Sequence, residues 1–114
     1  MEDYQKNFID LAIEKKALSF GEYELKSGRV SPYFFNTGTF NDGESLAKLG
    51  RFFAEAIRYS NIEFDMLYGP AYKGIPLASA ISITFHEIFN CNYPFCFNRK
   101  EIKDHGEGGI TFGA

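Results

Sequence analysis

Four side chains that carry or can acquire positive charge stand within seven residues near the end of this 114-residue sequence. They are Arg99, Lys100, Lys103 and His105. Glycines follow at 106, 108 and 109, and a glycine-rich cationic loop can close over an anionic substrate and neutralise charge that develops during a reaction. Three acidic residues between 101 and 107 offset much of this charge, so a solvated charge run is the alternative interpretation.

A second candidate is the segment 69–76, Gly-Pro-Ala-Tyr-Lys-Gly-Ile-Pro, between a predicted strand and a predicted helix. Backbone N–H groups at a helix start, together with Lys73, favour the binding of phosphate. The spacing of Gly69 and Gly74 is that of a P-loop, but Ile75-Pro76 stands where that motif requires Lys-Ser/Thr, which excludes it. An ordinary turn, with proline near the helix start, is the alternative.

A third candidate joins positive charge to paired aromatic rings. Lys26 precedes a turn at Ser27-Gly28-Arg29, and a strand is predicted at Pro32–Asn36. Because adjacent strand residues face opposite ways, Phe34 and Phe35 cannot both serve one core face. One ring is therefore available to stack on a flat heterocycle, and a strand buried on both faces is the alternative.

Hydrophobic periodicity predicts the elements that position these groups. They are an amphipathic helix at 3–18, strands at Ser19–Lys26 and Pro32–Asn36, a helix at 43–60, a strand at Phe64–Tyr68, a helix at 75–89 and a strand at Pro94–Asn98. The segment 64–98 is one βαβ unit, which places the fold in the α/β class. Parallel sheets normally have more strands, and the helix at 75–89 is apolar nearly all round. We therefore expect the front part of a larger domain.

Composition narrows the functional classes. A net charge of -3 and a pI near 5.3 argue against a general nucleic-acid binder. The two His and two Cys lack metal-ligand or Cys-x-x-Cys spacing, so no metal site made by protein ligands is expected. Prolines and asparagines interrupt the apolar stretch at 73–99, which argues against a membrane span. The acidic start, Met-Glu-Asp, lacks the order of a secretory signal and favours a cytoplasmic protein.

Four ordered motifs together resemble the amino-terminal part of the bacterial orotate phosphoribosyltransferase family, a type I phosphoribosyltransferase. The motifs occupy residues 20–29, 31–36, 69–76 and 97–108, and the resemblance runs from Tyr4 to about Gly109. It implies one incomplete domain over 1–114. Within that domain it implies an amino-terminal helix and β-hood strands at 1–40, the start of an αβαβ core at 41–98 and a catalytic loop at 99–114.

The resemblance also implies an activity. Members of the family transfer the phosphoribosyl group of phosphoribosyl pyrophosphate (PRPP) to orotate, which gives orotidine 5′-monophosphate and pyrophosphate in de novo UMP synthesis. The implied enzyme is a cytoplasmic homodimer whose catalytic loop reaches into the partner's active site. The implied cofactor is Mg²⁺, bound mainly through oxygens of PRPP and water.

Residue roles follow from the same resemblance. Phe34 and Phe35 would lie along orotate. The implied PRPP-binding residues are Lys26, Tyr72, Lys73, Arg99, Lys100, Lys103 and His105, and the implied catalytic residues are Lys73, Lys100, Lys103 and His105. Cleavage of the C1–pyrophosphate bond creates a ribosyl cation-like centre and a strongly anionic leaving group, so cations are needed on the pyrophosphate side.

The family's paired aspartates and Thr/Gly-rich turn, which hold the ribose hydroxyls and the 5′-phosphate, would fall beyond Ala114. The alternative is therefore a truncated, non-catalytic ligand-binding or vestigial chain that lacks the PRPP motif.

Overall fold

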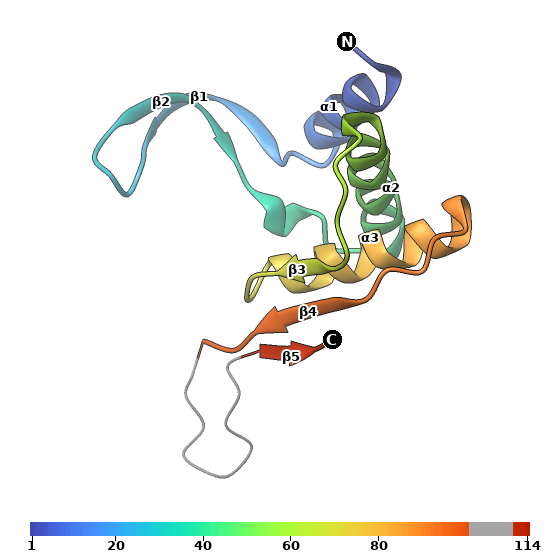
Figure 1. Cartoon of the computed structure of the whole chain (residues 1–114). Helices are drawn as coiled ribbons and strands as arrows, with labels where there is room; N and C mark the ends of the chain where they lie inside the picture. The colour runs from blue at the N-terminus through green and yellow to red at the C-terminus, as the bar shows by residue number, and fades with distance from the viewer. Residues whose placement is uncertain (101–110) are drawn as a thin grey trace.

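The computed structural model describes residues 1–100 and 111–114, and Figure 1 shows their arrangement. The elements in chain order are α1 (Asp3–Glu14), β1 (Leu18–Glu24), β2 (Val30–Phe35), η1 (Thr37–Thr39), α2 (Gly43–Ser60), β3 (Leu67–Gly69), α3 (Gly74–Phe89), β4 (Phe95–Asn98) and β5 (Thr111–Gly113). Each helix and strand that the periodicity predicts is present, and the differences lie at the element ends. None of the described helices is long and apolar enough to cross a membrane.

The predicted βαβ unit is confirmed. Strand β3 pairs with β4 in parallel, Gly69 opposite Phe97, and α3 makes the crossover between them. Strand β5, which the periodicity did not assign, pairs antiparallel to β4 and completes a sheet of order β3-β4-β5. The core of the described chain is thus mixed α/β, with α2 and α3 packed together beside the sheet (Figure 1).

Two element ends differ from prediction for identifiable reasons. Helix α1 stops at Glu14 rather than residue 18, because Lys16 takes a left-handed conformation (φ 59°) and the Ala17 N–H turns back to the Ala12 carbonyl, 2.8 Å away. Strand β3 begins at Leu67 rather than Phe64. The Phe64 ring lies 4.3 Å from that of Tyr93, measured between centroids, so it serves the core from outside the strand.

The β1–β2 hairpin swings away from the helices (Figure 1). At its tip the Gly28 N–H bonds to the Leu25 carbonyl at 2.9 Å, and Gly28 has a φ of 86° that favours glycine. At its base the Asn36 N–H bonds to the Ala17 carbonyl at 2.7 Å. The base of the hairpin is therefore fixed against the end of α1.

Two apolar clusters hold the helices together. One joins α1 to α2 through Leu11 and Leu49, and the other joins α2 to α3 through Ala54 and Phe85. A side chain at Gly50 would lie 2.8 Å from the Ala80 carbonyl oxygen, so glycine permits the close approach of α2 to α3. The described residues do not cover α3 completely, since the Ile83 side chain on this helix is 62% exposed.

The start of α2 gives a pH-dependent prediction. Hydrogen bonds from the hydroxyl and backbone N–H of Ser45 lower the pKa of Asp42 below its ordinary 3.8. Ionised Asp42 therefore stabilises the fold fully above that value, and the contribution is lost as pH falls through the lower folded pKa. We expect Asp42→Ala to lower the urea unfolding midpoint at pH 7, with a difference from wild type that shrinks below pH 3.8.

Asp42→Asn is the matched control, because a neutral asparagine also caps a helix start. Its midpoint relative to the alanine variant should change little over the same pH range. Equal midpoints for wild type and Asp42→Ala at pH 7 would contradict the prediction.

Candidate functional site

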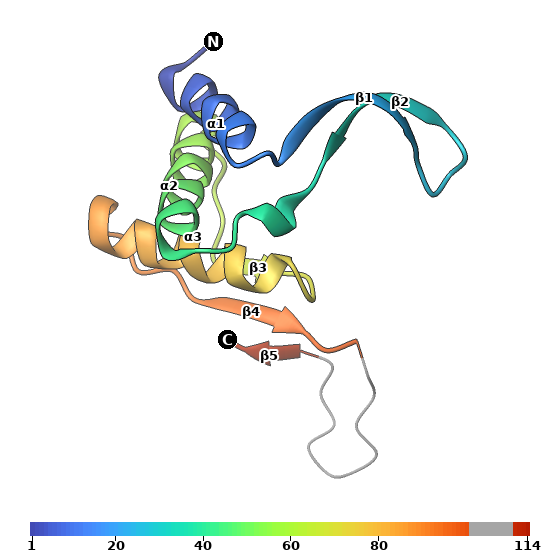
Figure 2. The same cartoon turned by 180° about the vertical axis from the view of Figure 1, so that it is seen from behind.

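The parallel pairing of β3 and β4 brings two sequence-predicted motifs to one edge of the sheet. The carboxyl ends of both strands lie at this edge, so the turn after Gly69 and the segment after Asn98 are neighbours (Figure 2). Ligands of α/β proteins bind at this edge of the sheet. A direct hydrogen bond joins the two motifs, because the Asn98 Oδ1 accepts from the Ala71 N–H at 2.5 Å. Asn98 belongs to the motif at 97–108, but the sequence alone assigned it no role in the candidate site.

The turn between β3 and α3 is so compact that positions 69 and 74 have no room for a side chain, and both are glycine. A Cβ on Gly69 would lie 2.8 Å from the Ala78 Cβ, and one on Gly74 would lie 2.7 Å from the Pro70 Cδ. The Gly74 N–H bonds to the Pro70 carbonyl at 3.0 Å, and the peptide between residues 71 and 72 is cis. This turn fixes Lys73 at the start of α3.

The cationic segment begins at the same edge. The Lys100 Nζ lies 5.3 Å from the centroid of the Tyr72 ring, so the structure brings these two predicted site residues together. The Arg99 guanidinium lies 4.0 Å from the centroid of the Phe112 ring. Lys103 and His105 lie outside the described residues.

A cavity of about 290 Å³ brings together two more predicted site residues, Phe35 and Lys73. It lies where β2, η1, α2 and α3 meet, and it is lined by Phe8, Phe35, Thr37, Gly38, Phe40, Leu46, Leu49, Phe53, Lys73, Gly74, Pro76 and Leu77. Among the described residues of this apolar lining, Lys73 has the one charged side chain. An apolar cavity with one cation suits a flat anionic molecule. The sequence motifs missed Thr37 and Gly38, although the Asn36 side chain that accepts from the Gly38 N–H at 3.0 Å is a recognisable turn signal.

The paired rings of β2 face opposite sides, as predicted. Phe35 packs near Phe8 and Phe40, with centroids 6.1 and 6.3 Å away, whereas Phe34 lies 5.7 Å from Tyr23 on the hairpin. Both rings are partly exposed, 44% for Phe34 and 38% for Phe35. Lys26 belongs to the hairpin tip, which projects away from the helices, so the structure does not bring it to Lys73 (Figure 1).

The chain is similar to known proteins in both sequence and fold. No family model matches the chain. Curated orotate phosphoribosyltransferases from Nitrosospira multiformis and Aeromonas salmonicida are 62% and 59% identical to it over all 114 residues, which span 50% and 52% of those proteins. The crystal structure of orotate phosphoribosyltransferase from Francisella tularensis matches 95% of this chain and 50% of its own, with 47% identity and a TM-score of 0.81.

The chain is similar, over its whole length, to the amino-terminal half of orotate phosphoribosyltransferases. The α/β fold that the motifs predicted, the front part of a type I phosphoribosyltransferase, is thereby confirmed. The chain spans about half the length of the curated relatives it matches. The division of the chain at residues 40 and 98, and the role of each site residue, stay predictions.

The described residues offer no ready-made set of protein ligands for a metal ion at this site. Residues 1–100 and 111–114 contain no group of three His, Cys, Asp or Glu side chains able to hold one. Lys73, Arg99 and Lys100 lie at this edge of the sheet, and their positively charged side chains cannot ligate a metal ion. Mg²⁺ would therefore fit the described residues only as an ion that arrives on a diphosphate and is held by its oxygens and by water.

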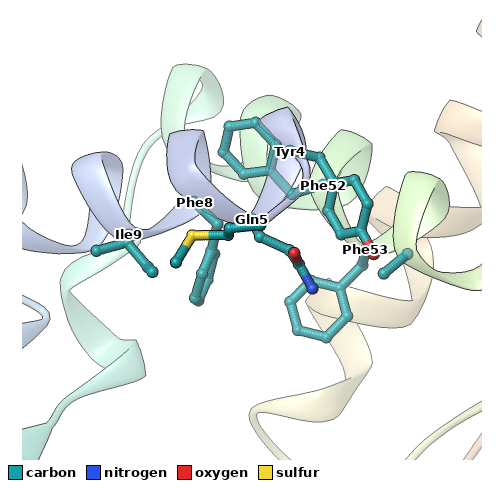
Figure 3. A pocket seen from close by; sticks show the side chains of 8 residues that line it. Tyr4, Gln5, Phe8, Ile9, Phe52 and Phe53 are labelled. Carbon is teal, nitrogen blue, oxygen red and sulfur yellow. The ribbon is translucent and has the colours of Figure 1, made fainter.

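A separate groove of about 450 Å³ lies between α1 and α2, lined by Met1, Tyr4, Gln5, Phe8, Ile9, Phe52, Phe53 and Ala56. Figure 3 shows its aromatic rings from both helices around the Gln5 side chain. None of the described residues that line it has a charged side chain, so it suits a diphosphate less well than the sheet edge with Lys73 and Lys100 does.

Proposed function

We propose that residues 1–114 form the orotate-facing and pyrophosphate-facing half of an orotate phosphoribosyltransferase active site. The observation that carries the proposal is the shared sheet edge, where the Asn98 side chain ties the turn at 69–74 to the cationic segment and Lys100 approaches Tyr72. The 62% identity to a curated enzyme of that name supports the same reaction. In that reaction the phosphoribosyl group of PRPP passes to orotate and pyrophosphate leaves.

The residue roles follow from position and chemistry. Phe35 and Lys73 share the cavity of about 290 Å³, and we assign it to the flat ring of orotate and the reacting end of PRPP. The remaining roles are assigned from the resemblance and not from this cavity. Phe34 is assigned to orotate, and Lys26, Tyr72, Arg99, Lys100, Lys103 and His105 are assigned to PRPP.

The proposed chemistry explains why cations gather here. The bond from C1 of the ribose to a pyrophosphate oxygen breaks, and a bond from an orotate ring nitrogen to C1 forms as that nitrogen loses its proton to solvent. Negative charge grows on the departing pyrophosphate, and Lys73 and Lys100 neutralise it without reorganisation because they are already placed at the sheet edge. Lys103 is assigned the same role from the resemblance. His105 is assigned to proton donation on the leaving-group side. Mg²⁺ supplies further charge neutralisation when it is bound to PRPP.

We further propose that the enzyme works in the cytoplasm, where reduced cysteines are expected. The described structure gives Cys91 and Cys96 as free thiols. A structural disulfide would instead have favoured an oxidising compartment.

The test joins residues 1–114 in frame to the carboxyl-terminal half of the Nitrosospira multiformis enzyme. Orotate consumption is followed by absorbance with PRPP and Mg²⁺, and the same fusion with Lys73→Ala is the control. We expect the fusion to consume orotate and to form pyrophosphate in equal amount. A folded fusion that binds PRPP but leaves orotate unchanged would contradict the proposed function and favour a non-catalytic binding chain.

We also propose a homodimer in which the cationic loop acts on the partner's site. The exposed Ile83 on α3 supports an apolar surface for a second copy. In the fusion, mixing a Lys103→Ala chain with a chain inactivated at the PRPP motif should restore part of the activity through hybrid sites. If proven subunit exchange gives no recovery, the loop acts within its own subunit.

A further inference from the structure

The Arg99 side chain has a buried N–H donor without a hydrogen-bond partner among the described residues. Its Nη1 atom is buried and has no hydrogen-bond partner among the described residues. A buried donor without a partner is uncommon, because it loses its hydrogen bonds to water without replacement. Arg99 is the neighbour of Lys100 in the chain. Both follow the carboxyl end of β4, at the same edge of the sheet as the turn at 69–74. The unmet donor therefore needs an acceptor from outside the described chain.

An aromatic ring determines where this guanidinium lies. Phe112 of β5 pairs directly with Phe97 of β4, and their rings stack with centroids 5.7 Å apart and planes 22° apart. Because side chains alternate along a strand, Arg99 lies two residues beyond Phe97 on the same face. Its guanidinium carbon stands 4.0 Å above the Phe112 ring centroid, within the range of a cation–π interaction.

We propose that Phe112 is a positioning residue for pyrophosphate binding, because its ring holds the Arg99 guanidinium, whose Nη1 has no hydrogen-bond partner among the described residues. This inference rests on the proposed function, which assigns Arg99 to the diphosphate of PRPP. Phe97 supports Phe112 from the neighbouring strand. Phe112 itself touches no reacting atom and acts only through Arg99.

Substitutions at Phe112 and at Arg99 should affect pyrophosphate binding in ways that can be told apart. Phe112→Leu keeps an apolar side chain but removes the π face, so the guanidinium gains rotational freedom that binding must then restrict. Phe112→Tyr keeps that face. In an Arg99→Gln background the ring has no cation to hold, so a further change at 112 should cost nothing.

The experiment titrates inorganic pyrophosphate into the 114-residue chain and into these variants by calorimetry, after circular dichroism has shown matching helix content. We expect Arg99→Gln to weaken binding, Phe112→Leu to weaken it about three- to tenfold, and Phe112→Tyr to restore it. In NMR spectra the Arg99 Nε–H proton should be shifted upfield by the ring in wild type and in Phe112→Tyr, and should lose that shift in Phe112→Leu.

The outcomes separate the two proposals. If Arg99→Gln weakens binding but Phe112→Leu binds as wild type does, or if the Phe112→Leu loss persists in the Arg99→Gln background, the positioning role is overturned and the proposed function stands. If the chain binds no pyrophosphate, or if Arg99→Gln binds it unchanged, the assignment of Arg99 to the diphosphate is overturned, and the role of Phe112 falls with it.

Discussion

Residues 1–114, expressed alone, should form no orotidine 5′-monophosphate at a rate comparable with a complete family member. The described chain contains the proposed orotate and pyrophosphate sides, but relatives such as the Nitrosospira multiformis enzyme are about twice as long. The resemblance places the groups that hold the ribose hydroxyls and the 5′-phosphate in that other half. Transfer requires C1 to lie in line between orotate and pyrophosphate, and intramolecular positioning of this kind supplies roughly 7–11 kcal/mol of catalysis.

The measurement follows orotate loss with PRPP and Mg²⁺ in a preparation free of host enzyme. The fusion to the carboxyl-terminal half, described under the proposed function, is the positive control. Residual binding of pyrophosphate by the short chain is compatible with the prediction. Turnover by residues 1–114 at the rate of the fusion would show that the other half does not position the ribose.

Periodicity predicted most of the fold because its long elements each bury one face. The helix at 43–60 was predicted with the bounds that α2 has, since an apolar stripe and a capping aspartate mark it clearly. The short elements were less well defined. Strand β5 spans three residues, Thr111–Gly113, and its pairing with β4 depends on a partner strand rather than on its own pattern.

The sequence predicted those parts of the candidate site that are local in the chain, and it missed the contacts between distant segments. Local motifs identified the turn at 69–76 and the start of the cationic segment, because each is a compact run of distinctive residue types. The bond from Ala71 to Asn98 joins residues 27 positions apart, and no local pattern indicates it. The cavity shared by Phe35 and Lys73 likewise appears only when β2 and α3 are brought together in space.

Loss of single lysines at the pyrophosphate side should slow the reaction strongly. In the fusion, Lys73→Ala, Lys100→Ala and Lys103→Ala are each expected to lower kcat by roughly tenfold to a thousandfold, the scale for one lost electrostatic contact to a developing charge. Lys73 immediately precedes α3 and lines the cavity, and Lys100 approaches Tyr72 at the sheet edge. Lys100 is therefore placed to meet the leaving group, and we assign Lys73 to the reacting end of PRPP in the cavity. The affinity for orotate should change much less than kcat.

Lys48→Ala is the matched control for these three variants. Lys48 lies on α2 and pairs with Glu44 at 2.9 Å, and it does not line the cavity of Phe35 and Lys73. Its removal should leave kcat near that of the unaltered fusion, because an exposed ion pair of this kind contributes little. Steady-state kinetics with both substrates varied separates kcat from the orotate KM. If kcat is unchanged in all three lysine variants, these side chains belong to a solvated charged surface and take no part in the reaction. A fall confined to the affinity for PRPP would instead make them binding residues with no larger role in the transition state.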